Sequence, residues 1–71
     1  MAVVKIIEEW HCWDGFLEGI VENSNQLYYA KTNDDPLQDA PRRYFAIPLF
    51  KYIVVNSRLP EFYFEEGELT R

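Results

Sequence analysis

The sequence has very few of the residues that form disulfides, metal sites or phosphate-binding loops in small domains. It contains one cysteine, one histidine and three glycines. A single cysteine excludes a disulfide within the chain, and one cysteine with one histidine leaves a structural zinc site short of ligands. Three glycines are too few for a glycine-rich phosphate loop. The lone cysteine suits a reducing compartment, so we expect a cytoplasmic protein.

Long apolar runs are also absent. No stretch approaches the ~20 apolar residues that a membrane-spanning helix needs. The apolar run within residues 1–10 is too short for a signal peptide, and the acids Glu8 and Glu9 follow it directly. We therefore expect a soluble protein.

Aromatic side chains are what the chain has in excess. Two tryptophans, five tyrosines and five phenylalanines make up 17% of its 71 residues. A chain this short buries only about 60% of the surface that its unfolded form exposes, so its stability margin is thin. Each aromatic ring can bury about 150–250 Å². We predict a single domain over residues 1–71 with a ring-filled core, and a frayed tail over residues 66–71.

The charge is negative overall but unevenly distributed. The net charge is −5, with −6 in residues 1–41, +4 in residues 42–58, which hold no acid, and −3 in residues 59–71. Direct nucleic-acid binding depends on neutralising phosphates, so this balance disfavours it. We expect an acidic protein with one basic segment.

Short apolar runs alternate with turn residues, as in antiparallel sheets. They predict strands over residues 3–10, 16–22, 27–32, 43–49 and 61–65, with Phe45, Ile47 and Leu49 pointing into the core. Asp14-Gly15 and the Asn23–Asn25 segment predict tight turns, and residues 33–41 a loop. Residues 50–55 fit a strand better than a helix, although a helical turn starting at Pro48 stays open.

Five or six short strands in a chain of this length predict an all-β fold. A small, strongly bent antiparallel barrel of the SH3-like kind, with room for one short helical turn, buries one apolar face and limits open edges. An open curled sheet packed on a short helix is the alternative. The imperfect alternation in residues 3–10 indicates a bulge or a strand covered on both faces.

The segment WHCWDG, residues 10–15, gathers groups that could serve a metal or a nucleophile. On a strand His11 and Cys12 point to opposite faces, and neither a zinc ligand set nor a nucleophile–base set is complete. We therefore predict no catalytic residue, no cofactor and no metal site. Trp10 and Trp13 fit better as side chains that cap the two ends of a core. The alternative is that one of them is exposed and anchors a partner protein.

The surface predicts a non-enzymatic protein that acts by binding another protein. One of the neighbours Tyr28 and Tyr29 is expected in the core and the other on the surface. The predicted binding residues combine exposed rings with carboxylates complementary to a basic partner: Trp13, Glu18, Tyr28, Asp34 and Tyr44. An accessory, immunity-like or inhibitor protein fits this description, and a homodimer stays open.

The basic segment supports an alternative function. Arg42, Arg43 and Lys51, with a neighbouring tyrosine, would form a cationic, aromatic patch able to hold a nucleotide or another small anion. The simpler interpretation is that these bases balance the acids of the first half.

Three stretches carry a resemblance: WDGFLEGIVE, NQLYYAKTNDD and RRYFAIPL. Over residues 10–49 they resemble a W-D-G-x-L-x-G hairpin pattern of small uncharacterised bacterial proteins. The resemblance implies a β-hairpin and a bacterial or phage origin. Phe16 stands where that pattern would have proline. No activity goes with those proteins, so the resemblance implies no site residue.

Overall fold

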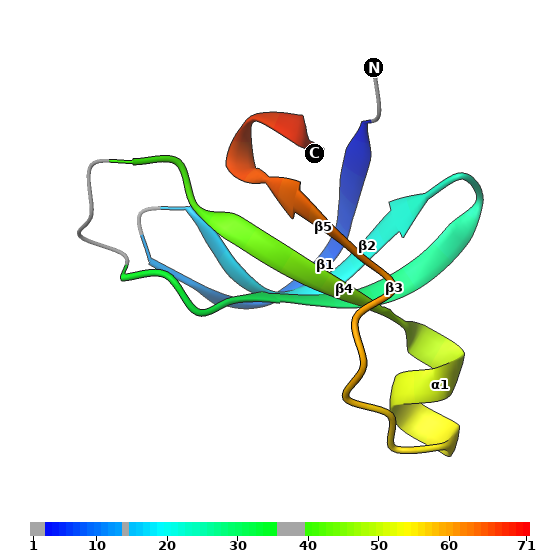
Figure 1. The fold of residues 1–71 in the computed structure, drawn as a ribbon. Coiled ribbons are helices and arrows are strands. Elements are labelled where there is room, and N and C mark those ends of the chain that lie inside the picture. The colour runs from blue at the N-terminus through cyan, green and yellow to red at the C-terminus, as the bar shows by residue number, and fades with distance from the viewer. Residues whose placement is uncertain (1–2, 14, 36–39) are drawn as a thin grey trace.

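A curled β-sheet with one short helix makes up the fold. The computed structural model describes residues 3–13, 15–35 and 40–71. Within these residues, six strands form one sheet in the order β5-β4-β3-β2-β1-β6. The elements are β1 (Val4–Cys12), β2 (Phe16–Asn23), β3 (Gln26–Thr32), β4 (Arg43–Pro48), α1 (Leu49–Val54), β5 (Phe62–Glu65), the 3₁₀ turn η1 (Glu66–Glu68) and β6 (Leu69–Thr70). The sheet curls into a half-barrel (Figure 1), which confirms the all-β, barrel-like prediction.

The first four strands form an antiparallel meander. Between β2 and β3, Ser24 and Asn25 have φ angles of 54° and 64°. Two consecutive residues with positive φ are the hallmark of the tight hairpin turn that matches strand twist, so the predicted turn is confirmed. Of the other predicted turn, Asp14 lies outside the described residues, and Gly15 has a φ of 119°.

β1 is irregular, as its imperfect alternation indicated. Its pairing with β2 shifts register at three places, between Ile6 and Glu8 and twice near His11. Each shift reverses which face the following side chains occupy. The bulges therefore explain why β1 carries exposed rings and aliphatic residues on both sides.

The last residues close the curl, so the prediction of a frayed tail over residues 66–71 is wrong. β5 pairs antiparallel with β4 at one edge, and β6 pairs parallel with β1 at the other. Only η1 separates β5 from β6, and Leu69 packs against the core opposite Val4. Arg71 also pairs with Glu9 on β1. The curl of the sheet brings its β4–β5 edge close to β1. Residues 66–71 are therefore held by the pairing of β6 with β1 and by the packing of Leu69 on the core.

Aromatic rings fill the concave face, as predicted. The buried cluster contains Val4, Phe16, Val21, Tyr28, Ala30, Tyr44, Ala46 and Phe64. Tyr44 stacks on Phe64 with ring centroids 5.0 Å apart, and its hydroxyl donates to the Phe16 carbonyl at 2.6 Å. Because that hydrogen bond satisfies the phenol, a tyrosine can lie at the centre of an apolar core.

The opposite side of the sheet, which we call the outer face, carries Tyr29, Phe45 and Ile47. The expectation that Phe45, Ile47 and Leu49 point into the core is wrong for the concave cluster, because Tyr44 and Ala46 occupy it and Leu49 begins α1. Strand alternation then puts the odd-numbered residues of β4 outside. Ile47 is nevertheless fully buried, because α1 packs across β3 and β4.

Residues 50–55 do not form the predicted strand, because all of them except Val55 belong to α1. Pro48 ends β4 and precedes the helix with a φ of −49°, a residue without an N–H that suits a helix start. At the other end Asn56 has a φ of 57°, and the Ser57 N–H donates to the Lys51 carbonyl at 2.9 Å. Both ends are therefore set by local backbone chemistry that overrides the β propensity of the apolar residues.

Candidate functional site

The largest group of exposed apolar side chains lies on and around α1. Exposed fractions are 69% for Phe50, 65% for Ile53, 66% for Val54, 63% for Val55 and 80% for Leu59. Leu27, in β3 next to the β2–β3 turn, adds a sixth at 41%. These six residues are called the apolar surface below. In Figure 1, α1 projects from the sheet on the side of the view opposite the chain termini.

The apolar surface follows from the periodicity of α1. Phe50, Ile53 and Val54 are spaced i, i+3, i+4, the spacing that places side chains on one helix face. Leu49 and Tyr52 are half-buried on the side toward the sheet. The helix is therefore apolar on two sides, and Lys51 is its one charged residue. A helix that is hydrophobic all round normally lies inside a protein, yet α1 has no buried residue.

A stack of rings holds α1 on the sheet. Tyr52 lies parallel to Tyr29, with centroids 3.9 Å apart and planes 9° apart, and the Arg58 guanidinium covers the Tyr52 ring at 4.6 Å. Trp10 packs against Tyr29 at 5.6 Å. The Tyr29 hydroxyl donates to the Glu18 carboxylate. Burial, followed by this bond to Glu18, raises the pKa of Tyr29. The stack fixes the orientation in which α1 presents its apolar side.

A shallow groove runs along the apolar surface. Leu49, Phe50, Ile53 and Val54 form one wall, and the β2–β3 turn with Asn25, Gln26 and Leu27 forms the other. The lining is mainly apolar, and the amides of Asn25 and Gln26 border it. Such a groove suits apolar side chains of a partner segment.

The charged residues next to the apolar surface are basic. Lys51 lies on α1 and Arg58 follows it, and residues 49–58 contain no acid. Neither Lys51 nor Arg58 has an acidic side chain of the described residues within ion-pair distance. The rim of this surface thus carries two cations that no carboxylate of the described chain neutralises.

Two of the predicted binding residues are not on the surface. Tyr28 and Tyr44 are 5% and 1% exposed, so their interpretation as exposed anchors is wrong. Tyr28 packs edge-on against Phe62, and its hydroxyl donates to Glu61 at 3.0 Å. Burial raises the pKa of both phenols. The expectation that Tyr28 or Tyr29 is exposed also fails, because α1 covers the outer-face ring.

The other three predicted binding residues reach the surface, where Glu18 and Asp34 line one small hollow together with His11 and Lys31. Trp13 is 61% exposed at the end of β1. Glu18 accepts the Tyr29 hydroxyl and lies 3.6 Å from the His11 imidazole. Asp34 accepts the Arg43 N–H at 2.7 Å and pairs with its guanidinium at 3.5 Å. Both carboxylates therefore have partners within the chain.

The basic residues of the alternative site are not brought together. Arg42 is 3% exposed and donates to the Trp13 carbonyl at 2.8 Å, which ties β4 to the turn before β2. Arg43 starts β4, whereas Lys51 lies on α1 beyond the other end of that strand. Because residues 50–55 form a helix and not a returning strand, Lys51 does not pair alongside Arg43.

The sequence interpretation missed the apolar surface altogether. Its signal was the segment LFKYIVV, residues 49–55, in which one lysine interrupts six apolar residues. As a strand this segment would supply core residues. As a helix it must leave one apolar side uncovered, which is what the structure shows.

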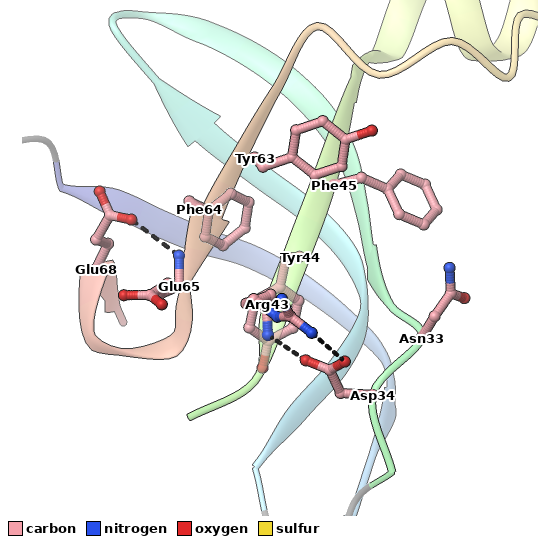
Figure 2. A pocket seen from close by; sticks show the side chains of 9 residues that line it. All are labelled: Asn33, Asp34, Arg43, Tyr44, Phe45, Tyr63, Phe64, Glu65 and Glu68. Atoms are coloured by element: carbon pink, nitrogen blue, oxygen red, sulfur yellow. Dashed lines mark hydrogen bonds and ion pairs between the residues drawn. The ribbon is translucent and has the colours of Figure 1, made fainter. Parts of the chain in front are cut away.

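A second concave feature lies on the outer face beside β5 (Figure 2). Phe45 and Tyr63 are cross-strand neighbours there, and Tyr63 is 72% exposed. Two adjoining hollows, of about 570 and about 560 Å³, share Asn33, Phe45 and Tyr63 in their walls. The first extends toward Arg43, Glu65 and Glu68, and the second toward Lys31, Tyr52 and Arg58.

The described residues contain no group of three or more His, Cys, Asp and Glu side chains that could hold a metal ion. No helix in residues 3–13, 15–35 and 40–71 is long and apolar enough to cross a membrane. Protein-family models, curated proteins and solved structures contain no match to this chain.

Proposed function

We propose that this protein is a non-enzymatic binding domain that docks a partner protein through the apolar surface. The observation that carries the proposal is a helix that is apolar on two sides and has no buried residue. Contiguous exposed apolar patches on small domains mark interaction sites. Fully burying one aliphatic or aromatic side chain contributes about 1.5–3 kcal/mol. Six side chains that are 41–80% exposed can therefore supply the apolar centre of a specific interface.

The partner that fits best presents apolar side chains flanked by carboxylates. Lys51 and Arg58 border the apolar surface, and a carboxylate placed against them would form charge-assisted contacts. A second copy of this chain fits less well. In a symmetric dimer the same patch faces itself, so the two cations of one protomer would meet those of the other. The sequence also predicts a partner with a basic surface. That partner would bind the acidic side chains elsewhere on the molecule, and it stays a prediction.

The test combines capture with matched variants. The immobilised protein is used to capture a partner, which is identified, purified and titrated against each variant. Ile53→Ser should weaken binding about tenfold, a loss that only a minority of interface residues cause. Val3→Ser, which changes a 54% exposed residue at the other end of the molecule, should leave the affinity unchanged.

The charge of the partner is tested separately. Lys51→Glu should weaken binding of an acidic partner, and Lys5→Glu, an exposed control on β1, should not. A partner that binds Ile53→Ser as tightly as the wild type would refute docking at the apolar surface. Light scattering that shows a dimer, dispersed by Ile53→Ser, would replace the proposed partner with a second copy.

A further inference from the structure

We propose that the part of the outer-face hollow between Lys31 and Arg58 binds a small molecule that combines a planar ring with one anionic group. This site meets the apolar surface at Arg58 but uses other residues, Lys31, Phe45 and Tyr63, and goes beyond protein docking. We call it the Lys31–Arg58 hollow. Its walls come from β3, β4, α1, β5 and the segment between α1 and β5. Figure 2 shows the two rings at its boundary, Phe45 and Tyr63.

The size and lining of the hollow are those of a ligand site. Its volume of about 560 Å³ lies within the range of small-molecule pockets. Phe45 is half-buried and packs 6.3 Å from Tyr29, so its position is fixed by the outer-face stack. Tyr63 lies directly across from it in register and is 72% exposed. An exposed ring next to a fixed ring offers a face on which a planar ligand can stack.

The charges at this end favour an anion. Lys31 and Arg58 line the hollow, and no acidic side chain of the described residues lies within ion-pair distance of either. One carboxylate shares the lining, that of Glu18, and it accepts the Tyr29 hydroxyl and faces His11. The Arg58 guanidinium lies over the Tyr52 ring in a cation–π contact and donates to the Ser57 carbonyl at 3.2 Å, and these contacts orient it.

Asp34 lines a neighbouring small hollow with Lys31 and Glu18, whereas Glu65 and Glu68 line the first hollow with Arg43. Glu65 is directly across from Arg43 in register, and Glu68 accepts the Glu65 N–H at 2.9 Å. Asp34 is paired with Arg43. The two carboxylates nearest Lys31 thus have other partners, Tyr29 and His11 for Glu18 and Arg43 for Asp34, and neither is within ion-pair distance of Lys31 or Arg58.

The test uses four probes and ¹⁵N–¹H correlation spectra of the full chain. Adenosine 5′-monophosphate and indole-3-carboxylate carry a ring and an anion, adenosine carries the ring alone, and inorganic phosphate carries the anion alone. We expect the first two to shift the amides of Lys31, Phe45 and Tyr63 at millimolar concentration. Adenosine and phosphate should each bind at least fivefold more weakly. Whichever of the two anionic rings binds more tightly identifies phosphate or carboxylate as the preferred group.

Matched variants locate the contacts. Tyr63→Ala should weaken binding about tenfold through lost stacking, and Lys31→Gln by a similar factor. The controls are Trp13→Ala, another exposed ring, and Lys5→Gln, another exposed lysine, and both should bind like the wild type. The proposal is overturned if neither anionic ring shifts these amides, if adenosine binds as tightly as its monophosphate, or if the controls lose binding equally. Failure here leaves docking through Ile53 untouched, since the variants used for that test lie outside this hollow.

Discussion

Removing the Tyr52 ring should release α1 from the sheet, and the contacts of the ring set the size of the effect. Tyr52 stacks on Tyr29 at 3.9 Å and lies under the Arg58 guanidinium at 4.6 Å. A favourable ring pair contributes about 0.5–1.5 kcal/mol beyond burial, and an exposed cation–π contact about 0.5–1 kcal/mol. With the apolar area that a half-buried ring removes from water, Tyr52→Ala should lower the free energy of unfolding by about 2–3 kcal/mol.

This loss is large for a chain of 71 residues, because small domains unfold at roughly 4–10 kcal/mol. The midpoint of thermal unfolding should fall by about 10 °C or more. Urea titration followed by fluorescence measures the free energy directly. Hydrogen exchange should also quicken at Val55 and Ser57, whose N–H groups donate to the Lys51 carbonyl at the end of α1.

Tyr63→Ala is the matched control, because that ring is 72% exposed. Its effect on the free energy of unfolding should stay within about 0.5 kcal/mol. Tyr52→Phe keeps the stacked ring and should retain most of the stability. If Tyr52→Ala and Tyr63→Ala unfold at the same urea concentration, the stack does not hold α1, and our account of how the apolar surface is presented is wrong.

Two further predictions concern the bulged strand pair and alkaline pH. Gly19→Ala should lower the free energy of unfolding by about 3 kcal/mol or more, because the added Cβ would collide with the β1 backbone. Gly67→Ala is the control and should unfold like the wild type, because its added Cβ meets nothing within 4 Å. Equal stability of the two variants would contradict the close approach of β1 and β2. Above pH 10 the free energy of unfolding should fall, because the unfolded chain releases the Tyr29 proton near its ordinary pKa of 10.0 while the folded state, in which that pKa is raised, keeps it. Tyr29→Phe should flatten this decline in urea titrations between about pH 10 and 11. Tyr63→Phe is the control and should leave the decline unchanged. If Tyr29→Phe also leaves it unchanged, the decline does not come from Tyr29.

Local chemistry in the sequence was enough to predict the sheet. Alternating apolar residues and the Asn23–Asn25 turn depend on neighbours along the chain, and the strands and the turn follow them closely. The shortage of cysteine and histidine and the excess of rings led to the aromatic core. The irregular β1 pattern likewise indicated its bulges. Each of these features is set by residues a few positions apart or by composition alone.

The site depended on contacts between distant residues. Segment 49–55 has strand propensity, yet it is helical because Pro48 and Asn56 bound it and Tyr52 stacks on a ring from β3. Strand alternation puts Tyr28 and Tyr44 on the core face, so neither is an anchor, and the same stack buries Tyr29. β6 is held because the curl brings the two sheet edges together. The apolar segment 49–55 signals that some of its side chains stay uncovered if it is helical, but which ones do depends on how α1 lies on the sheet.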